Sequence, residues 1–217
     1  ILGMASVAAA APTPSSTVSD REIQAAVDRG VRYLLQTLPA NSGGRASLMV
    51  LALLKAGVPP EKPELKAAIE RIAARVTAEG TFLVSGDHNY DAGVTLMALA
   101  NADPKKFKPQ ITVLTRYLIS NQNPDGDWDY PVGNPHRGTG DTSITQYAVL
   151  GLWDATRAGV EVPTRVWDNV ARWHISRQQR DGGFAYHPRP GGMESSHTMT
   201  VAGVGSLLVA RLHLFGA

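Results

Sequence analysis

Two stretches of the chain, "YLISNQNPDGDW" at 117–128 and "WHISRQQRDGGF" at 173–184, follow one pattern. Each opens on an aromatic residue, continues to a glutamine, and ends with a glycine two positions before a second aromatic residue. The shared positions are Gln122, Gly126 and Trp128 in the first stretch and Gln178, Gly182 and Phe184 in the second. The stretches are offset by 56 residues, and the same offset carries Thr142 onto Thr198 and Leu152 onto Leu208. A period that holds over this length predicts an internal structural repeat.

The rest of the chain from Ser19 onward has the spacing of α-helices. "SDRE" at 19–22 is a capping box, and the apolar residues after it recur at intervals of three and four, with no strand-like alternation. "AGVPPE" at 56–61 and "AGVEVP" at 158–163 are helix-ending signals of the same type. The second helix of each predicted pair is richer in Ala, Gly and Leu, which favours an inner layer covered by the first helices. We therefore expect an all-α repeat domain over 19–217, with hairpins at about 19–57, 63–101, 104–159 and 163–213.

The shared frame resembles the QW repeat of squalene and hopene cyclases. The chain as a whole resembles the α/α toroids of terpenoid cyclases, protein prenyltransferases and squalene oxidase repeat proteins, although the two clear motifs cover only about 104–212. The resemblance implies a partial α/α toroid of about four helical hairpins, with inner and outer helix layers. It also implies that the glutamine and the aromatic residue tie the end of an outer helix to the start of the next inner helix.

Two interpretations of the "DGDWD" segment at 125–129 compete. As part of a structural joint, Asp125 and Asp127 accept hydrogen bonds from turn N–H groups and Gly126 supplies a positive φ. As a calcium loop, Asp125, Asp127 and Asp129 alternate like EF-hand ligands. The sixth loop position is then Tyr130 instead of glycine, and the twelfth is His136 instead of glutamate. The pattern therefore favours the joint.

In a ring of repeats, equivalent positions share one rim, so the starts of the inner helices should meet at one mouth of the central cavity. Three candidate site residues stand at these starts, namely Asp91, Asp141 and His197. Aspartate is a preferred N-cap, and this structural role is favoured over catalysis for both acids. His197 has no capping role to explain it. Two loops that precede inner helices, 136–140 and 187–193, are rich in glycine and basic residues. They are interpreted as a lip over the mouth or a partner surface, with ordinary flexible loops as the alternative.

Neither chemistry of the resembled family is complete in this chain. The zinc site of protein prenyltransferases resembles Asp141, Ser143 and His197, but a neutral serine hydroxyl stands in place of the thiolate. The Asp-x-Asp-Asp motif of class II terpene cyclases does not occur, and neither do the common hydrolase, phosphate-loop and metalloprotease motifs. The sequence therefore predicts no metal site and no cofactor.

Composition and charge limit the partners. A net charge of +2 with no basic run argues against nucleic acid. The absence of cysteine excludes disulfides, thiolate catalysis and cysteine-ligated zinc. The start of the chain, "ILGMASVAAAAPTPSS", resembles a signal-peptide remnant followed by a linker, together spanning 1–18, and predicts an exported protein, periplasmic or secreted. An Ala-rich leader without a targeting role is the alternative.

Two functions are compatible with these observations. The first is a non-catalytic or degenerate toroid module that binds a protein or an apolar ligand on its concave face, with a peripheral membrane contact as a further option. The second is part of a terpenoid cyclase or prenyltransferase type of enzyme that acts on isoprenoid substrates. Its catalytic residues would then lie partly outside residues 1–217. The two functions differ in the role of the residues at the starts of the inner helices, which take part in catalysis only in the second.

The purified protein should hold no stoichiometric zinc or calcium, because a serine replaces the thiolate and the acidic alternation departs from the EF-hand pattern. Elemental analysis after mild dialysis measures this directly. One ion per chain that is lost in Asp141→Ala would contradict the prediction and favour the prenyltransferase-type site.

Overall fold

The structure is a computed structural model that describes residues 18–84, 88–134, 137–138, 140–188 and 194–216. The leader expected at 1–18 therefore lies outside the described residues except for Val18. Over the described residues the chain is all-α, as predicted, and its only β contacts are two isolated bridges, Val76 with Phe82 and Phe184 with Ser196. The elements are α1 (Asp20–Thr37), a short 3-10 turn η1 (Leu38–Ala40), α2 (Gly43–Lys55), α3 (Pro63–Ala73), α4 (His88–Ala102), α5 (Lys108–Ser120), α6 (Thr142–Arg157), α7 (Thr164–Arg177) and α8 (His197–Phe215).

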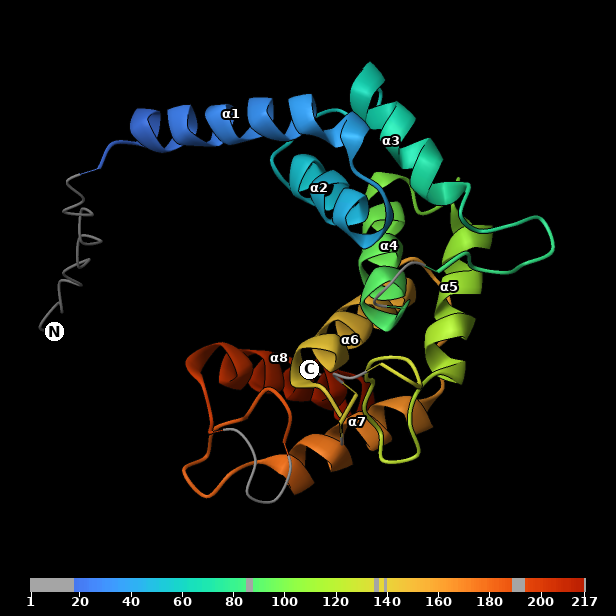
Figure 1. Ribbon diagram of the computed structural model, residues 1–217, viewed down its shortest axis with the longest axis vertical. Helices are drawn as coiled ribbons and strands as arrows, with labels where there is room; N and C mark the ends of the chain where they lie inside the picture. The colour runs from blue at the N-terminus through green and yellow to red at the C-terminus, as the bar shows by residue number, and fades with distance from the viewer. Residues whose placement is uncertain (1–17, 85–87, 135–136, 139, 189–193, 217) are drawn as a thin grey trace, which may run out of the picture.

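The helices form a curved arc of two layers (Figure 1). α2, α4, α6 and α8 follow one another along the inner side, each packed on the next, and α3, α5 and α7 lie outside them. α1 extends from one end of the arc and has no fully buried residue, whereas its predicted capping box at Ser19 and Glu22 is present. The described helices make an open arc, and a closed toroid remains a prediction.

Small residues allow the inner helices to approach one another closely. A Cβ added to Gly93 of α4 would lie 2.5 Å from the carbonyl oxygen of Tyr147 in α6, and one added to Gly151 of α6 would lie 3.0 Å from the Cα of Gly93. Between α2 and α4, the buried hydroxyls of Ser47 and Thr95 share a hydrogen bond of 2.8 Å. Backbone contact of this kind needs positions without large side chains, which accounts for the Ala and Gly content of the inner layer.

The predicted joint is present at the first motif. The side-chain amide of Gln122 donates to the carbonyl oxygens of Gly126, at 3.0 Å, and Val166 in α7, at 3.2 Å, so it links consecutive outer helices and not, as the resemblance implied, an outer helix to the next inner helix. Trp128 is fully buried, and its indole N–H donates to the carbonyl of Leu118 at 2.8 Å. Gly126 has a φ of +106°, and an added Cβ would lie 2.2 Å from the carbonyl oxygen of Asn169, so glycine is required there.

The second motif repeats this arrangement except for the link between outer helices, since the bond of Gln178 stays within its own loop. Gln178 donates to the carbonyl oxygen of Gly182 at 2.8 Å, and Phe184 is fully buried like Trp128. The backbone N–H of Trp128 donates to a threonine of the following inner helix, Thr145, at 3.0 Å, and that of Phe184 donates to Thr200 at 3.1 Å. The joint therefore holds the outer layer to the inner layer in both repeats.

The predicted register of the inner helices is wrong by one residue. The motif aromatics are offset by 56, but the threonines that they bond, Thr145 and Thr200, are offset by 55. The N-caps of α6 and α8, Asp141 and Ser196, are also offset by 55. The equivalence of Thr142 with Thr198 therefore fails, because the loop before α8 is one residue shorter than the loop before α6.

The turn role predicted for the acids of this loop is also wrong in part. Asp127 is buried rather than solvated, and its carboxylate accepts from the side-chain amide of Asn123 at 2.8 Å. Burial raises the pKa of Asp127. Asp125 is exposed and pairs with Arg177 of α7 at 3.2 Å. The acid that accepts from turn N–H groups is Asp129.

Replacement of the buried tryptophan tests the joint. Trp128→Ala should lower the free energy of unfolding by about 3 to 5 kcal/mol, because it removes a fully buried ring and the indole hydrogen bond. Asp127→Asn is the matched control and should change the free energy of unfolding little, because an amide oxygen can also accept from Asn123. Denaturant unfolding of both variants measures this, and equal losses would contradict it.

Candidate functional site

Asp141 is the N-cap of α6, as predicted. Its backbone is extended, with φ −129° and ψ 117°, and its Oδ1 accepts from the backbone N–H of Ile144 at 2.7 Å. The backbone N–H of Asp141 donates to the carbonyl of Trp128 at 3.3 Å, so the joint fixes the position of the cap. The side chain is fully buried, which a solvated cap would not be.

The second carboxylate oxygen of Asp141 distinguishes it from an ordinary cap. Oδ2 is buried without a hydrogen-bond partner, and the Nδ1 atom of His187 lies 3.7 Å away. Burial raises the pKa of Asp141 to about 6, although the N–H of Ile144 and the nearby His187 oppose the increase. This carboxyl group therefore changes its protonation state close to neutral pH, which is typical of functional sites.

Asp91 is not an N-cap, so that prediction is wrong. It lies in the first turn of α4, which begins at His88, and its side chain is 1% exposed. Both of its carboxylate oxygens accept from the guanidinium of Arg75, and the bond to Oδ1 is 2.6 Å long. Arg75 comes from the segment that follows α3, so the ion pair ties the outer layer to the start of an inner helix. Asp91 therefore has a structural role.

His197 is the first residue of α8, and its side chain is exposed. The N-cap of α8 is Ser196, whose Oγ accepts from the backbone N–H of Met199 at 3.3 Å. Asp91, Asp141 and His197 thus stand near the starts of consecutive inner helices, as expected, but Asp91 pairs with Arg75 and Asp141 faces His187. Among the described residues, no group of three His, Asp or Glu side chains could hold a metal ion.

The acids of the "DGDWD" segment have separate partners instead of a common ion cage. Asp129 accepts from the backbone N–H groups of Gly138, at 2.9 Å, and Gly140, at 3.1 Å, through Oδ2, and from that of Tyr130 through Oδ1 at 2.7 Å. These bonds fold the loop before α6 back onto the motif. His136, the last position of the alternative calcium loop, lies outside the described residues.

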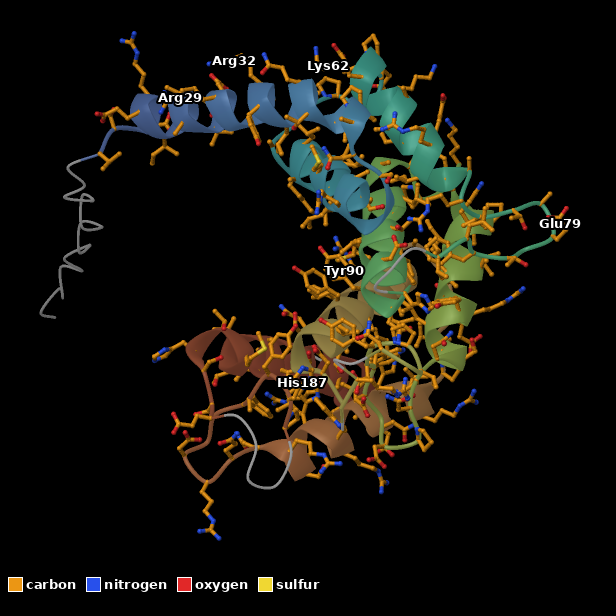
Figure 2. All side chains as sticks on the ribbon, viewed as in Figure 1. Arg29, Arg32, Lys62, Glu79, Tyr90 and His187 are labelled. Carbon is orange, nitrogen blue, oxygen red and sulfur yellow. The ribbon has the colours of Figure 1, made fainter. Side chains whose placement is uncertain are left out.

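Three tyrosines come together beside Asp141, and we call this cavity the tyrosine pocket. Its volume is about 190 Å³, and its lining residues are Tyr90, Tyr130, Ser143, Ile144 and Tyr186. Figure 2 labels Tyr90 at the inner edge of the arc, so the pocket faces the concave side. Tyr90 starts α4, Ser143 and Ile144 start α6, and Tyr130 and Tyr186 follow the two motifs. The predicted mouth therefore contains a pocket with an aromatic lining.

Contacts among the rings hold the tyrosine pocket in shape. The hydroxyls of Tyr130 and Tyr186 are 3.3 Å apart. Tyr90 makes an edge-to-face contact with Tyr147 at 4.6 Å, and Tyr186 makes one with His187 at the same distance. Burial, the hydroxyl of Tyr130 and the charge of Asp141 all raise the pKa of Tyr186, so this hydroxyl stays protonated.

The sequence held one signal for this pocket. Tyr130 and Tyr186 are offset by the 56 residues that relate the two motifs, each two positions after the motif aromatic. His187, Asp129 and Tyr90 carried no comparable signal, because their role depends on which segments meet. The glycine-rich loop that begins at His187 predicted a lip over the mouth, and nothing in the sequence indicated that His187 lies beside the buried carboxylate of Asp141.

Comparison with known proteins returned no relatives. No protein-family model, no curated protein and no solved structure matches the chain. The resemblance to terpenoid cyclases and prenyltransferases therefore rests on the motifs alone.

The pH dependence of stability tests the environment of Asp141. Since its pKa in the folded protein lies above the ordinary value of 3.8, the fold favours the protonated form, and burial of the charged form destabilises the protein above pH 6. Asp141→Asn keeps a capping oxygen but cannot ionise. At pH 7.5 the variant should be more stable than the wild type by on the order of 2 kcal/mol. The difference should shrink as the pH falls towards 4, and unfolding at four pH values measures it. A difference that is constant with pH would contradict the assigned environment.

Proposed function

We propose that this chain is a non-catalytic, terpenoid-cyclase-like helical-repeat module that binds a protein segment or an apolar ligand on the concave face of its arc. The observation that carries the proposal is the tyrosine pocket at the starts of α4 and α6. Concave sites lined by aromatic side chains with a few polar groups are the usual binding sites of helical and repeat proteins.

The lining of the pocket suits a binding surface. Its tyrosines are half-buried, so each offers an apolar ring and a hydroxyl at a fixed position. Ile144 adds apolar surface and Ser143 a further hydroxyl. The rings are held by edge-to-face contacts and by the joint loops, so binding requires little ordering of side chains.

A catalytic function is the second candidate, and Asp141 favours it. A buried carboxyl with a pKa of about 6 and an unpaired oxygen beside His187 has the protonation behaviour of a general acid. However, Asp141 is fully buried and is not among the residues that line the pocket. A general acid must reach the proton acceptor on its substrate, so the geometry supports binding better than catalysis.

We propose two features of the module's setting. The first is export, periplasmic or secreted, on the basis of the leader expected from the sequence at 1–18. Among the described helices, α8 is long and apolar enough to cross a membrane by length and composition, and most of it is not buried inside the structure. Its exposed residues Val201, Leu208 and Phe215 are the surface we propose for a peripheral membrane contact.

Binding of farnesol tests the apolar-ligand form of this function. We expect saturable binding to the wild type, weakened about five-fold or more in Tyr90→Ser, because the variant removes one wall of the pocket. Tyr33→Ser is the matched control, since Tyr33 is exposed on α1, away from the pocket, and should leave binding unchanged. Titration followed by protein NMR measures both. Equal loss in the two variants, or no saturable binding, would contradict the proposal.

A turnover assay separates the two candidate functions. Incubation with a polyprenyl substrate should give no product with the wild type or with Asp141→Ser, which keeps a capping hydroxyl. Conversion by the wild type that Asp141→Ser abolishes, with the fold retained, would establish the enzyme instead.

A further inference from the structure

Two carboxylates, Asp141 and Asp129, lie near the tyrosine pocket, and so do two basic side chains, His187 and Arg137, of which Arg137 donates to the carbonyl of Tyr130 at 2.6 Å. No lysine or arginine is among the described residues that line it. The carboxylate of Asp141 lies behind the pocket, close enough to Tyr186 to raise the pKa of that phenol, and Asp129 is close enough to Asp141 to raise its pKa in turn. The basic group beside this carboxylate is His187, at 3.7 Å. The lining itself therefore carries no cation, and the buried carboxylate of Asp141 contributes negative potential there.

The lining adds to this potential. The face of an aromatic ring carries partial negative charge and attracts cations, most strongly those that are poorly hydrated. Three tyrosine side chains line a single small cavity here, and Ile144 offers an apolar contact for alkyl groups. Aromatic cages of this kind recognise quaternary ammonium groups in many proteins.

The size of the pocket limits the ligand class. The volume of about 190 Å³ lies below the roughly 300–1,000 Å³ of sites for drug-sized ligands, so the pocket holds a small group or one end of a longer ligand. The carboxylate of Asp141 is fully buried, with Ile144 bonded to Oδ1 and His187 3.7 Å from Oδ2, so it acts on a ligand through its charge and not through direct contact. A bare metal ion fits less well, because the described residues contain no group of three His, Asp or Glu ligands.

We propose that the tyrosine pocket binds an alkylated ammonium group, with Tyr90, Tyr130 and Tyr186 around the cation and the carboxylate of Asp141 behind it. This inference rests on the proposed function, since it names the group that enters the pocket of the binding module. The methyl groups of such a cation contact the rings and Ile144, while its charge is attracted by the rings and by Asp141. A neutral group of the same shape contacts the rings and Ile144 in the same way but lacks the attraction between charges.

Choline and its neutral carbon isostere, 3,3-dimethylbutan-1-ol, test the role of charge. Both are titrated into the wild-type protein, and binding is followed by calorimetry and by NMR of the tyrosine rings. Choline should bind about ten-fold or more tightly than the isostere, since cation–π contacts and a buried carboxylate favour only the cation. Equal affinity would overturn the inference and leave the proposed function standing. If farnesol, choline and the isostere all fail to bind, both proposals are overturned.

Variants locate the effect in the pocket. Tyr186→Leu should weaken choline binding about ten-fold, whereas Tyr186→Phe should stay within about three-fold of the wild type, because phenylalanine keeps the charged ring face. Asp141→Asn keeps the cap and should weaken choline binding several-fold without weakening the isostere. The melting temperature of each variant reports whether it folds. Unchanged choline binding in both Tyr186→Leu and Asp141→Asn would overturn the inference.

The same ammonium chemistry occurs in free solutes and in lipid headgroups. Cosedimentation with vesicles of phosphatidylcholine, compared with vesicles of phosphatidylglycerol, distinguishes these sources. Binding to the first vesicle only, with competition by free choline, supports a lipid headgroup as the ligand. Binding of free choline with no cosedimentation supports a soluble ammonium compound.

Discussion

The indole of Trp128 is the contact on which the rest of the described structure depends. It is fully buried where the outer helix α5 gives way to the inner helix α6, and its N–H satisfies the carbonyl of Leu118 at the end of α5. Its backbone N–H and carbonyl both bond the hydroxyl of Thr145 inside α6. One residue thus provides hydrophobic burial, a hydrogen bond to the last turn of one helix and the alignment of the next.

The candidate site is built outward from the same residue. The carbonyl of Trp128 also accepts from the backbone N–H of Asp141, which places the buried cap. The next residue, Asp129, binds the N–H groups that close the loop before α6, and the one after it, Tyr130, lines the tyrosine pocket. The position of the pocket is therefore set by the structural joint. A binding site on such a support needs little rearrangement to receive a ligand.

Local patterns in the sequence predicted the helices, the capping box at Ser19 and the cap at Asp141, because each depends on residues a few positions apart. That Gln122 bonds to backbone was implied by the family resemblance, and its partner Val166 belongs to the next outer helix. The role of Asp91 was missed because its partner, Arg75, belongs to another element, and no spacing rule relates them. The register of α8 was wrong by one residue because loop length is independent of helix periodicity. The tyrosine pocket draws on three segments, and only the pair Tyr130 and Tyr186 could have been read from the repeat. The toroid family and the function remain predictions, since no protein-family model, curated protein or solved structure matches the chain.

The glycines at the interface of α4 and α6 bear on the shape of the arc. Because backbone meets backbone at Gly93 and Gly151, the inner helices sit closer together than helices separated by full side chains. The outer helices carry larger residues, among them Trp167 and Trp173 in α7. When neighbouring helices lie closer together in the inner layer than in the outer layer, the stack of repeats must curve towards the inner layer. The radius of the arc is thus encoded as a difference in side-chain volume between its two layers, and repeats with other volumes on either side would trace arcs of other radii.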